Sequence, residues 1–206
     1  MINKKHNLIA SHNTFSYLPP RYKIFNLFEG FWRCQQLNIN EQLDNGVEYL
    51  DVRVRYTFDG KVRLCHGIVD YGNEYDSLAE LVDDLIYKNI PTTKSKKKKI
   101  HYRLILERGN RFSFESDTDD IVENQVKDNP NVVLDWVVIK KEWKTYYQNF
   151  GKLTIVDVCF KKWNIFNIIY ALFGGNPIKR HAEKHDAYDN SHIILFKDYI
   201  KYNEND

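Results

Sequence analysis

Apolar positions recur along the chain with two different spacings, one typical of strands and one typical of helices. Strand-like runs, either apolar throughout or alternating apolar with polar, occupy 7–13, 47–56, 61–67, 100–109, 131–141, 152–160 and 192–200. Stretches with helical spacing lie at 38–46, 76–89, 117–129 and 164–175. Strands that alternate with helices along one chain predict an α/β fold with a mainly parallel sheet.

The run 47–56 is the most informative of these segments, because its aliphatic residues alternate with charged ones. Asp51, Arg53 and Arg55 share one face of the expected strand, and the aliphatic side chains share the other. The segment therefore predicts a strand with one apolar face and one charged face.

The length of the chain limits it to one domain. Its 206 residues, of which 43% are hydrophobic, suffice for one sizeable core but not for two ordinary domains. We expect a single domain over 1–206. A small, distorted or incomplete (β/α)8 barrel and an open doubly wound sheet both fit the order of elements, although a complete barrel usually needs about 250 residues.

Charge and cysteine content argue against several classes of protein. The net charge of +2 argues against a nucleic-acid partner, although lysines gather at 94–99. The three cysteines are not spaced as in a zinc knuckle or a disulfide scaffold. The N-terminal segment lacks the apolar core of a signal peptide, and the longest apolar stretch, 163–175, is too short to span a bilayer. We therefore expect a soluble, cytoplasmic protein.

Polar residues gather at the expected carboxyl ends of five strands, where the active sites of parallel α/β folds lie. They are His12, Asn13, Asp51, Arg53, His66, Glu107 and Asp198. Taken singly, each has an ordinary explanation, such as a structural histidine or an ion pair between Asp51 and a neighbouring arginine. Their shared position instead predicts a catalytic site.

Two histidines and an arginine suit the cleavage of a phosphodiester. A neutral imidazole can take a proton from a nucleophile, and a protonated imidazole can give one to a leaving oxygen. A guanidinium can bind phosphate as a bidentate fork. His12, His66 and Arg53 are therefore the leading catalytic candidates.

Three short motifs, in register, resemble the catalytic X-region of the phosphatidylinositol-specific phospholipase C superfamily. They are "SHNTF" at 11–15, "INEQLDNGVEYLDVRV" at 39–54 and "LCHG" at 64–67. Glu48 departs from the pattern, which has arginine there. The resemblance is good over about 8–70, weak through the middle of the chain, and returns loosely at 192–200.

The resemblance implies a distorted TIM barrel that cleaves phosphatidylinositol in two steps, with a cyclic inositol phosphate as product. His12 would be the general base and His66 the general acid. Arg53 would neutralise the phosphate, Asp51 would hold part of this network, and Asp198 would orient His12. The sequence leaves open whether Asp198 or Asp157 fills that last role.

The resemblance leaves the metal requirement open between two forms. Calcium-dependent members have oxygen ligands at the positions of Asn13, Asp51, Arg53 and Glu107. The arginine in this set should repel a divalent ion and replace its charge, so we expect no cofactor. Calcium held by the remaining three is the alternative, and otherwise Asn13, Glu107 and Arg55 are expected to contact substrate.

Two segments could bring the protein to a lipid surface. Aromatic residues are frequent in 17–32, directly after the first motif, and lysines fill 94–99. Peripheral membrane contact and a phospholipid substrate are the expectation. A soluble substrate, such as a glycerophosphodiester or nucleotide, and a catalytically inactive barrel that binds lipid or protein are the alternatives.

Overall fold

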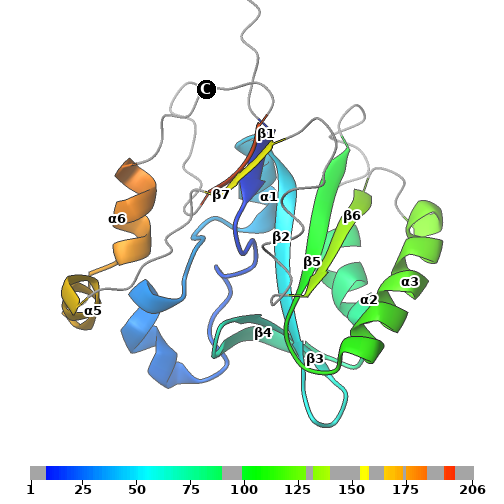
Figure 1. Ribbon diagram of the computed structural model, residues 1–206, viewed down its shortest axis with the longest axis horizontal. Helices are drawn as coiled ribbons and strands as arrows, with labels where there is room; N and C mark the ends of the chain where they lie inside the picture. The colour runs from blue at the N-terminus through cyan, green and yellow to red at the C-terminus, as the bar shows by residue number, and fades with distance from the viewer. Residues whose placement is uncertain are drawn as a thin grey trace, which may run out of the picture.

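The computed structural model describes residues 8–89, 99–128, 132–139, 154–157, 165–173, 175–184 and 193–197. Its strands are β1 (Leu8–Ser11), β2 (Val47–Tyr56), β3 (Val62–His66), β4 (Val69–Tyr75), β5 (Ile100–Arg108), β6 (Val132–Ile139), β7 (Thr154–Asp157) and β8 (Ile193–Lys197). Its helical elements are η1 (Lys23–Phe31), α1 (Ile39–Asp44), α2 (Leu78–Val82), η2 (Asp83–Tyr87), α3 (Arg111–Asp128), α5 (Ile165–Leu172) and α6 (Pro177–Lys184). Together they form one eight-stranded sheet with helices around it (Figure 1).

Six parallel strands follow one another around the sheet in the order β7-β8-β1-β2-β5-β6. The first and last strands of the chain, β1 and β8, pair directly, as they do in a closed barrel. Within the described residues no pairing joins β6 to β7, so the barrel is open at that point. The incomplete α/β barrel expected from the sequence is the architecture that forms.

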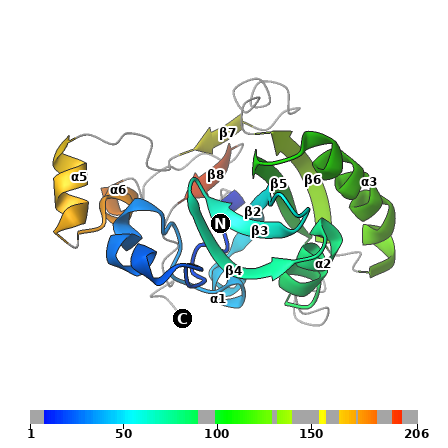
Figure 2. The ribbon, with the colours of Figure 1, turned by 90° about the horizontal axis from the view of Figure 1, so that it is seen from below.

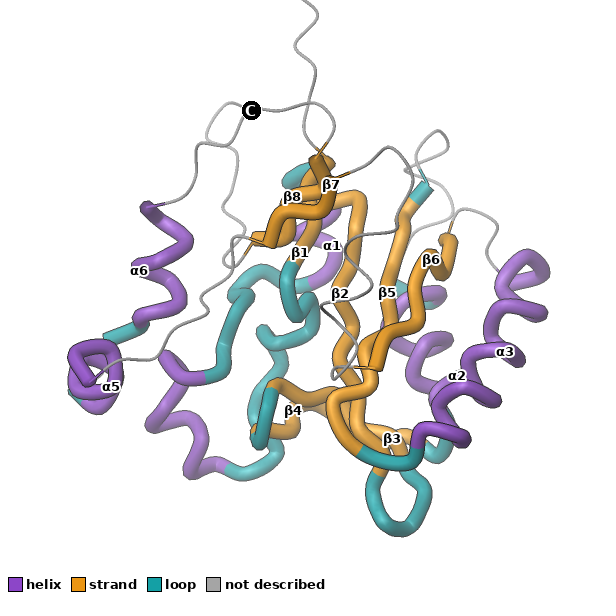
Figure 3. The backbone as a smooth tube through the Cα atoms, in the orientation of Figure 1, coloured by secondary structure: helices purple, strands orange, loops and turns teal. Residues whose placement is uncertain are grey.

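An antiparallel hairpin, β3–β4, extends the sheet from the carboxyl end of β2. The strand β3 pairs with the carboxyl end of β2, and β4 pairs with β3. Figure 3 shows the loop after β1 running along β2 toward this hairpin. Backbone hydrogen bonds hold it there, from Thr14 N–H to the Asp51 carbonyl and from Gly72 N–H to the Pro19 carbonyl.

Apart from α1, which contacts β2, the helices lie in two groups at opposite ends of the sheet (Figures 1 and 2). One group, α2 and α3, lies beside β5 and β6 and covers the core formed by aliphatic and aromatic residues of β2, β3 and β5. The other group consists of η1, α5 and α6, which contact one another. No helix within the described segments is both long and apolar enough to cross a membrane.

The predicted elements are observed, with small shifts at their ends. The strand at 47–56 has the bounds that the alternation indicates. The helix expected at 117–129 begins six residues earlier, at Arg111, because the side chain of Asn110 accepts the Phe112 N–H at 2.9 Å and caps it.

Three elements, η1, β4 and α6, are missing from the sequence prediction. The segment of β4 is rich in polar residues and has no run of apolar ones. Its Asp70 is nonetheless buried, since the side chain pairs with Arg55 on β2 and with Arg63 on β3 at 3.3 Å.

Candidate active site

The loop after β1 is fixed by side chains of its own motif and of α1. Gln42 accepts a hydrogen bond from the Ser11 hydroxyl, and its amide donates to the carbonyls of Thr14 at 2.9 Å and Leu37 at 2.7 Å. The Thr14 hydroxyl accepts the Asp51 N–H at 2.9 Å. These hydrogen bonds hold the buried turn after β1 in one conformation, so the direction in which His12 leaves β1 is fixed.

His12 and Arg53 are in direct contact. Nη2 of Arg53 lies 2.5 Å from Nε2 of His12, and both side chains are buried. A guanidinium has no acceptor, so Nε2 of His12 accepts this bond and the neutral imidazole carries its proton on Nδ1. The nitrogen nearest to Arg53 therefore has the lone pair that a general base needs.

Arg53 joins the two carboxylates of the site. It donates to Oδ2 of Asp51 at 3.0 and 3.1 Å and to Oε1 of Glu107 at 3.1 Å. Nη2 of Arg103 lies 3.2 Å from the same Asp51 oxygen. Burial alone raises the pKa of Asp51, but the charges of Arg103 and Arg53 outweigh it and hold that pKa far below its ordinary value. Asp51 is therefore ionised, and its charge is paired with the two guanidinium groups.

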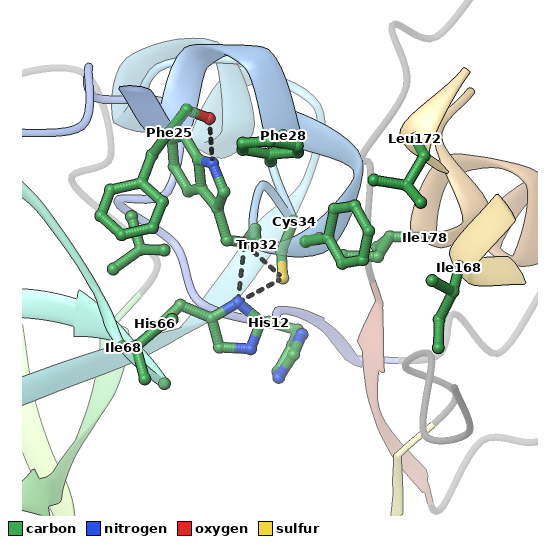
Figure 4. A pocket seen from close by; sticks show the side chains of 13 residues that line it. His12, Phe25, Phe28, Trp32, Cys34, His66, Ile68, Ile168, Leu172 and Ile178 are labelled. Atoms are coloured by element: carbon green, nitrogen blue, oxygen red, sulfur yellow. Dashed lines mark hydrogen bonds between the residues drawn. The ribbon is translucent and has the colours of Figure 1, made fainter. Parts of the chain in front are cut away.

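His66 stands at the end of β3, opposite His12. The centroids of the two rings are 5.9 Å apart and the ring planes are almost perpendicular. Nδ1 of His66 lies 2.6 Å from the Trp32 carbonyl, which can only accept, so this nitrogen carries a proton. The Cys34 thiol lies 3.7 Å from the same nitrogen (Figure 4). Trp32 therefore orients the ring and leaves Nε2 as the atom for proton transfer.

The His66 environment disfavours the protonated ring. Burial, then the positive charge of Arg53, and then His12 lower the pKa of His66 from 6.5 to about 4. Glu107 opposes this shift, and its second carboxylate oxygen accepts the Gly67 N–H at 3.0 Å. His66 is therefore neutral at pH 7 before an anion enters the site.

The side chains of Asn13 and Arg55 have partners on the β3–β4 hairpin, and their contact with substrate stays a prediction. The Asn13 side chain accepts a hydrogen bond from the Tyr71 hydroxyl, and the Asn13 backbone N–H donates to Oδ2 of Asp51 at 3.1 Å. Arg55 pairs with the buried Asp70. Of the residues expected to contact substrate, only Glu107 lies within the network of Arg53.

Five of the predicted residues come together, namely His12, Asp51, Arg53, His66 and Glu107. Asp198 lies outside the described residues. Asp157 ends β7, and its side chain is also not described. The orienting partner of His12 thus stays a prediction.

Two contributors to the site were not expected from the sequence. Arg103 lies on β5 four residues before Glu107, so strand alternation places both on one face. From this spacing, Arg103 could have been predicted from the sequence to lie in the site beside Glu107. The contribution of Trp32 is a backbone carbonyl, which every residue has, so no pattern of residue types indicates it.

An apolar pocket of about 720 Å³ adjoins the two imidazoles (Figure 4). Its walls come from η1, the β3–β4 turn, α5 and α6. They include Phe25, Phe28, Ile68, Ile168, Leu172 and Ile178. The proton-transfer groups are therefore reached from an apolar space.

An anion bound at Arg53 is expected to raise the pKa of His66 above its value of about 4 in the free protein. Negative charge stabilises the imidazolium, so the protonated fraction at a given pH increases when the anion binds. Histidine ¹⁵N resonances followed over pH 3–8, with and without inorganic phosphate, measure this shift, and a His66→Gln variant assigns the signal. A free-protein pKa near 6.5 would contradict the burial of this ring.

Comparisons with known proteins find similarity in structure only. No protein-family model matches the chain, and no curated protein matches it. A phosphatidylinositol-specific phospholipase C from Listeria monocytogenes superimposes with a TM-score of 0.60 over 96% of this chain and 89% of that one, at 13% identity. A pentafluoro-Phe variant of the Staphylococcus aureus enzyme gives a TM-score of 0.57 over 98% and 89%, at 14% identity.

A second Staphylococcus aureus structure, from work on the modulation of that enzyme's membrane binding, gives a TM-score of 0.51 at 16% identity and covers 93% of this chain and 71% of that one. These likenesses agree with the pairing of β1 with β8 and with the parallel strand order. The chain therefore has the fold of the bacterial phosphatidylinositol-specific phospholipases C, with the barrel open between β6 and β7 in its described part.

Proposed function

We propose that the protein is a phosphodiesterase of the phosphatidylinositol-specific phospholipase C type. The observation that carries this proposal is the arrangement of two imidazoles, 5.9 Å apart, with the guanidinium of Arg53 bonded to His12. Such a set can hold a phosphate anion while one ring accepts a proton and the other donates one. The likeness to bacterial phospholipases C supports the same class.

The reaction begins with His12 as the general base. When the Arg53 N–H that His12 accepts turns to the phosphate, Nε2 of His12 is free to take the proton of the inositol 2-hydroxyl, and that oxygen attacks phosphorus. Arg53 offers its N–H groups to the phosphate oxygens, where negative charge increases. The bond from phosphorus to the glycerol oxygen breaks, and His66 gives that oxygen its proton from Nε2. The products are a cyclic inositol phosphate and diacylglycerol.

His66 must be protonated to act as the acid, and the substrate itself helps to meet this requirement. The phosphodiester brings a negative charge close to an imidazole whose pKa is lowered to about 4 mainly by burial and by Arg53. That charge shifts the equilibrium toward the imidazolium. Acid catalysis by His66 is thus coupled to the binding of an anionic substrate.

A divalent ion does not fit the carboxylates of this site. Asp51 contacts both Arg53 and Arg103, and Glu107 is bonded to Arg53. A calcium ion between Asp51 and Glu107 would meet the guanidinium that already joins them. We therefore assign the neutralising charge to Arg53 and no role to a metal.

Membrane contact is proposed through exposed apolar side chains of η1 and α5. The exposed fractions of Ile24 and Leu27 on η1 are 57% and 69%, and Phe166 on α5 is also exposed. Trp32, expected from the sequence to contribute, is only 1% exposed, because its indole packs on Tyr71 and donates to the Phe25 carbonyl. The lysines at 94–98 are not among the described residues.

Replacing Ile24 and Leu27 together by serine is expected to weaken binding to phosphatidylinositol-containing vesicles at least about tenfold. Each change removes apolar area worth more than 1 kcal/mol if it is fully buried in lipid. Vesicle sedimentation measures the binding, and Phe112→Ser, exposed on α3 at the other end of the sheet, is the control. Equal loss in the control, or no loss in the double variant, argues against this contact surface.

A substrate panel tests the proposed activity. The protein is incubated with phosphatidylinositol, other phospholipids, a glycerophosphodiester and a cyclic nucleotide, and the products are followed by ³¹P NMR. A cyclic inositol phosphate signal is expected from phosphatidylinositol. If only the soluble diesters are cleaved, the substrate is a soluble phosphodiester. If no compound of the panel is cleaved, the protein is a barrel without this catalytic activity.

A further inference from the structure

The pocket beside the histidines is apolar on the sides that the described residues form. It is lined by phenylalanine, isoleucine and leucine side chains. Its polar side chains are the imidazoles of His12 and His66 and the thiol of Cys34, besides Trp32, whose indole N–H is already bonded to the Phe25 carbonyl. Figure 4 shows the two rings along one side of this space, with η1 opposite them and α5 beside them. The pocket is continuous with the reacting groups.

A polyol headgroup does not suit this pocket. Each hydroxyl that moves from water into an apolar space without a partner loses its hydrogen bonds at a cost of at least about 1 kcal/mol. The two imidazoles and the thiol cannot satisfy the hydroxyls of an inositol ring and also transfer protons. A hydrocarbon chain loses nothing of this kind and gains from the burial of its methylenes.

Resting on the function proposed above, we propose that this pocket binds the hydrocarbon of the leaving alcohol. His66, the group that gives a proton to the leaving oxygen, lies on its wall together with the next residues of the β3–β4 turn, Gly67 and Ile68. Atoms bonded to that oxygen must therefore lie next to the apolar walls. The volume of about 720 Å³ falls within the range of small-molecule sites and is far larger than a packing defect.

The pocket also reaches the surface, as a lipid substrate requires. The side chains of Ile68 and Leu172 line it and are more than half exposed. Leu172 belongs to α5 itself, and Phe25 and Phe28 of η1 line the same pocket, so both elements proposed to contact the bilayer also border the pocket. A hydrocarbon can thus pass from the lipid surface to the pocket without crossing a polar barrier formed by these elements.

Chain length is the variable that tests this site. Soluble inositol phosphodiesters with straight-chain leaving alcohols, from methyl to octyl, are compared below their critical micelle concentrations. We expect kcat/KM to rise about two- to fourfold for each added methylene until the pocket is filled, since each CH₂ removed from water contributes on that scale. The monomeric substrates separate this effect from binding to an interface.

Two serine variants of α5 test whether the dependence of kcat/KM on chain length comes from this pocket. Leu172 and Ile165 are 58% and 61% exposed on the same helix, but only Leu172 lines the pocket. Leu172→Ser is expected to flatten the dependence on chain length, and Ile165→Ser to leave it unchanged. Equal slopes in the two variants would place the hydrocarbon elsewhere.

Binding without turnover separates this inference from the proposed function. Calorimetry with n-alkyl phosphates is expected to show affinity that increases with chain length and a heat-capacity change that becomes more negative. Cleavage with no dependence on chain length would overturn the pocket assignment and leave the activity intact. Absence of cleavage would reject the activity. The affinity for n-alkyl phosphates would then decide alone whether the pocket binds hydrocarbon: an increase with chain length would support it, and no increase would reject it.

Discussion

His12→Ala and His66→Ala are each expected to lower the turnover of phosphatidylinositol by at least about 100-fold. A general acid or base commonly contributes that much, and the two rings act on the two different protons of one displacement. The rate of cyclic inositol phosphate formation, followed by ³¹P NMR, measures the loss. The double variant should lose little more than either single variant, because the two groups serve the same step.

A third histidine is the control for this pair. His101 on β5 stacks on Tyr49 with ring centroids 4.7 Å apart and does not line the pocket. His101→Ala should therefore keep most of the activity. Thermal unfolding of all three variants excludes loss of the fold, and near-normal turnover in a folded His12 or His66 variant would reject the paired-histidine mechanism.

Arg53→Asp is expected to convert a metal-independent enzyme into one that depends on calcium. The wild-type protein should keep its activity in EDTA, because the guanidinium already stands between Asp51 and Glu107. In the variant, three carboxylates and Asn13 form an oxygen-rich site of the kind that calcium binds. Activity should be nearly absent without metal and partly restored by millimolar calcium.

Stability gives a second measurement of the same change. Removing one partner of a buried ion pair costs about 3–5 kcal/mol, because the remaining carboxylates stay buried without a counter-charge. Calcium should therefore raise the unfolding temperature of the variant, whereas Arg111→Asp, an exposed change on α3, should show no such response. Wild-type activity that is abolished by EDTA and restored by calcium would contradict the role assigned to Arg53.

The catalytic candidates were predictable because strand alternation and strand ends are local properties of a sequence. His66 is the last residue of β3, Glu107 is the last but one of β5, and His12 directly follows β1. The pattern of apolar residues indicates the bounds of these strands well. Alternation alone also places Asp51 and Arg53 on one face of β2. Their contact with His12 needed only the parallel pairing of β1 with β2.

The remainder of the site depends on contacts between distant segments. The membrane role expected of Trp32 failed because an aromatic residue in a loop can be part of the core, and its carbonyl instead serves His66. Arg55, which was expected to contact substrate, pairs with Asp70 on a strand that the sequence did not indicate. Neither outcome follows from residue type or spacing, since each requires knowledge of which strand becomes the neighbour.

The pairing of β1 with both β2 and β8 has a consequence for protein synthesis. The strand that leads to His12 leaves the ribosome before all the other described strands, and β8, at 193–197, leaves after them. Until β8 emerges, one edge of β1 has backbone groups without their final partners, and such an edge can pair with other chains. At that stage the nascent chain contains all three sequence motifs, but the strand that leads to His12 has not yet paired with β8. We therefore expect the edge of β1 to need protection during translation for longer than it would in a protein whose active-site strand pairs only with neighbours in sequence.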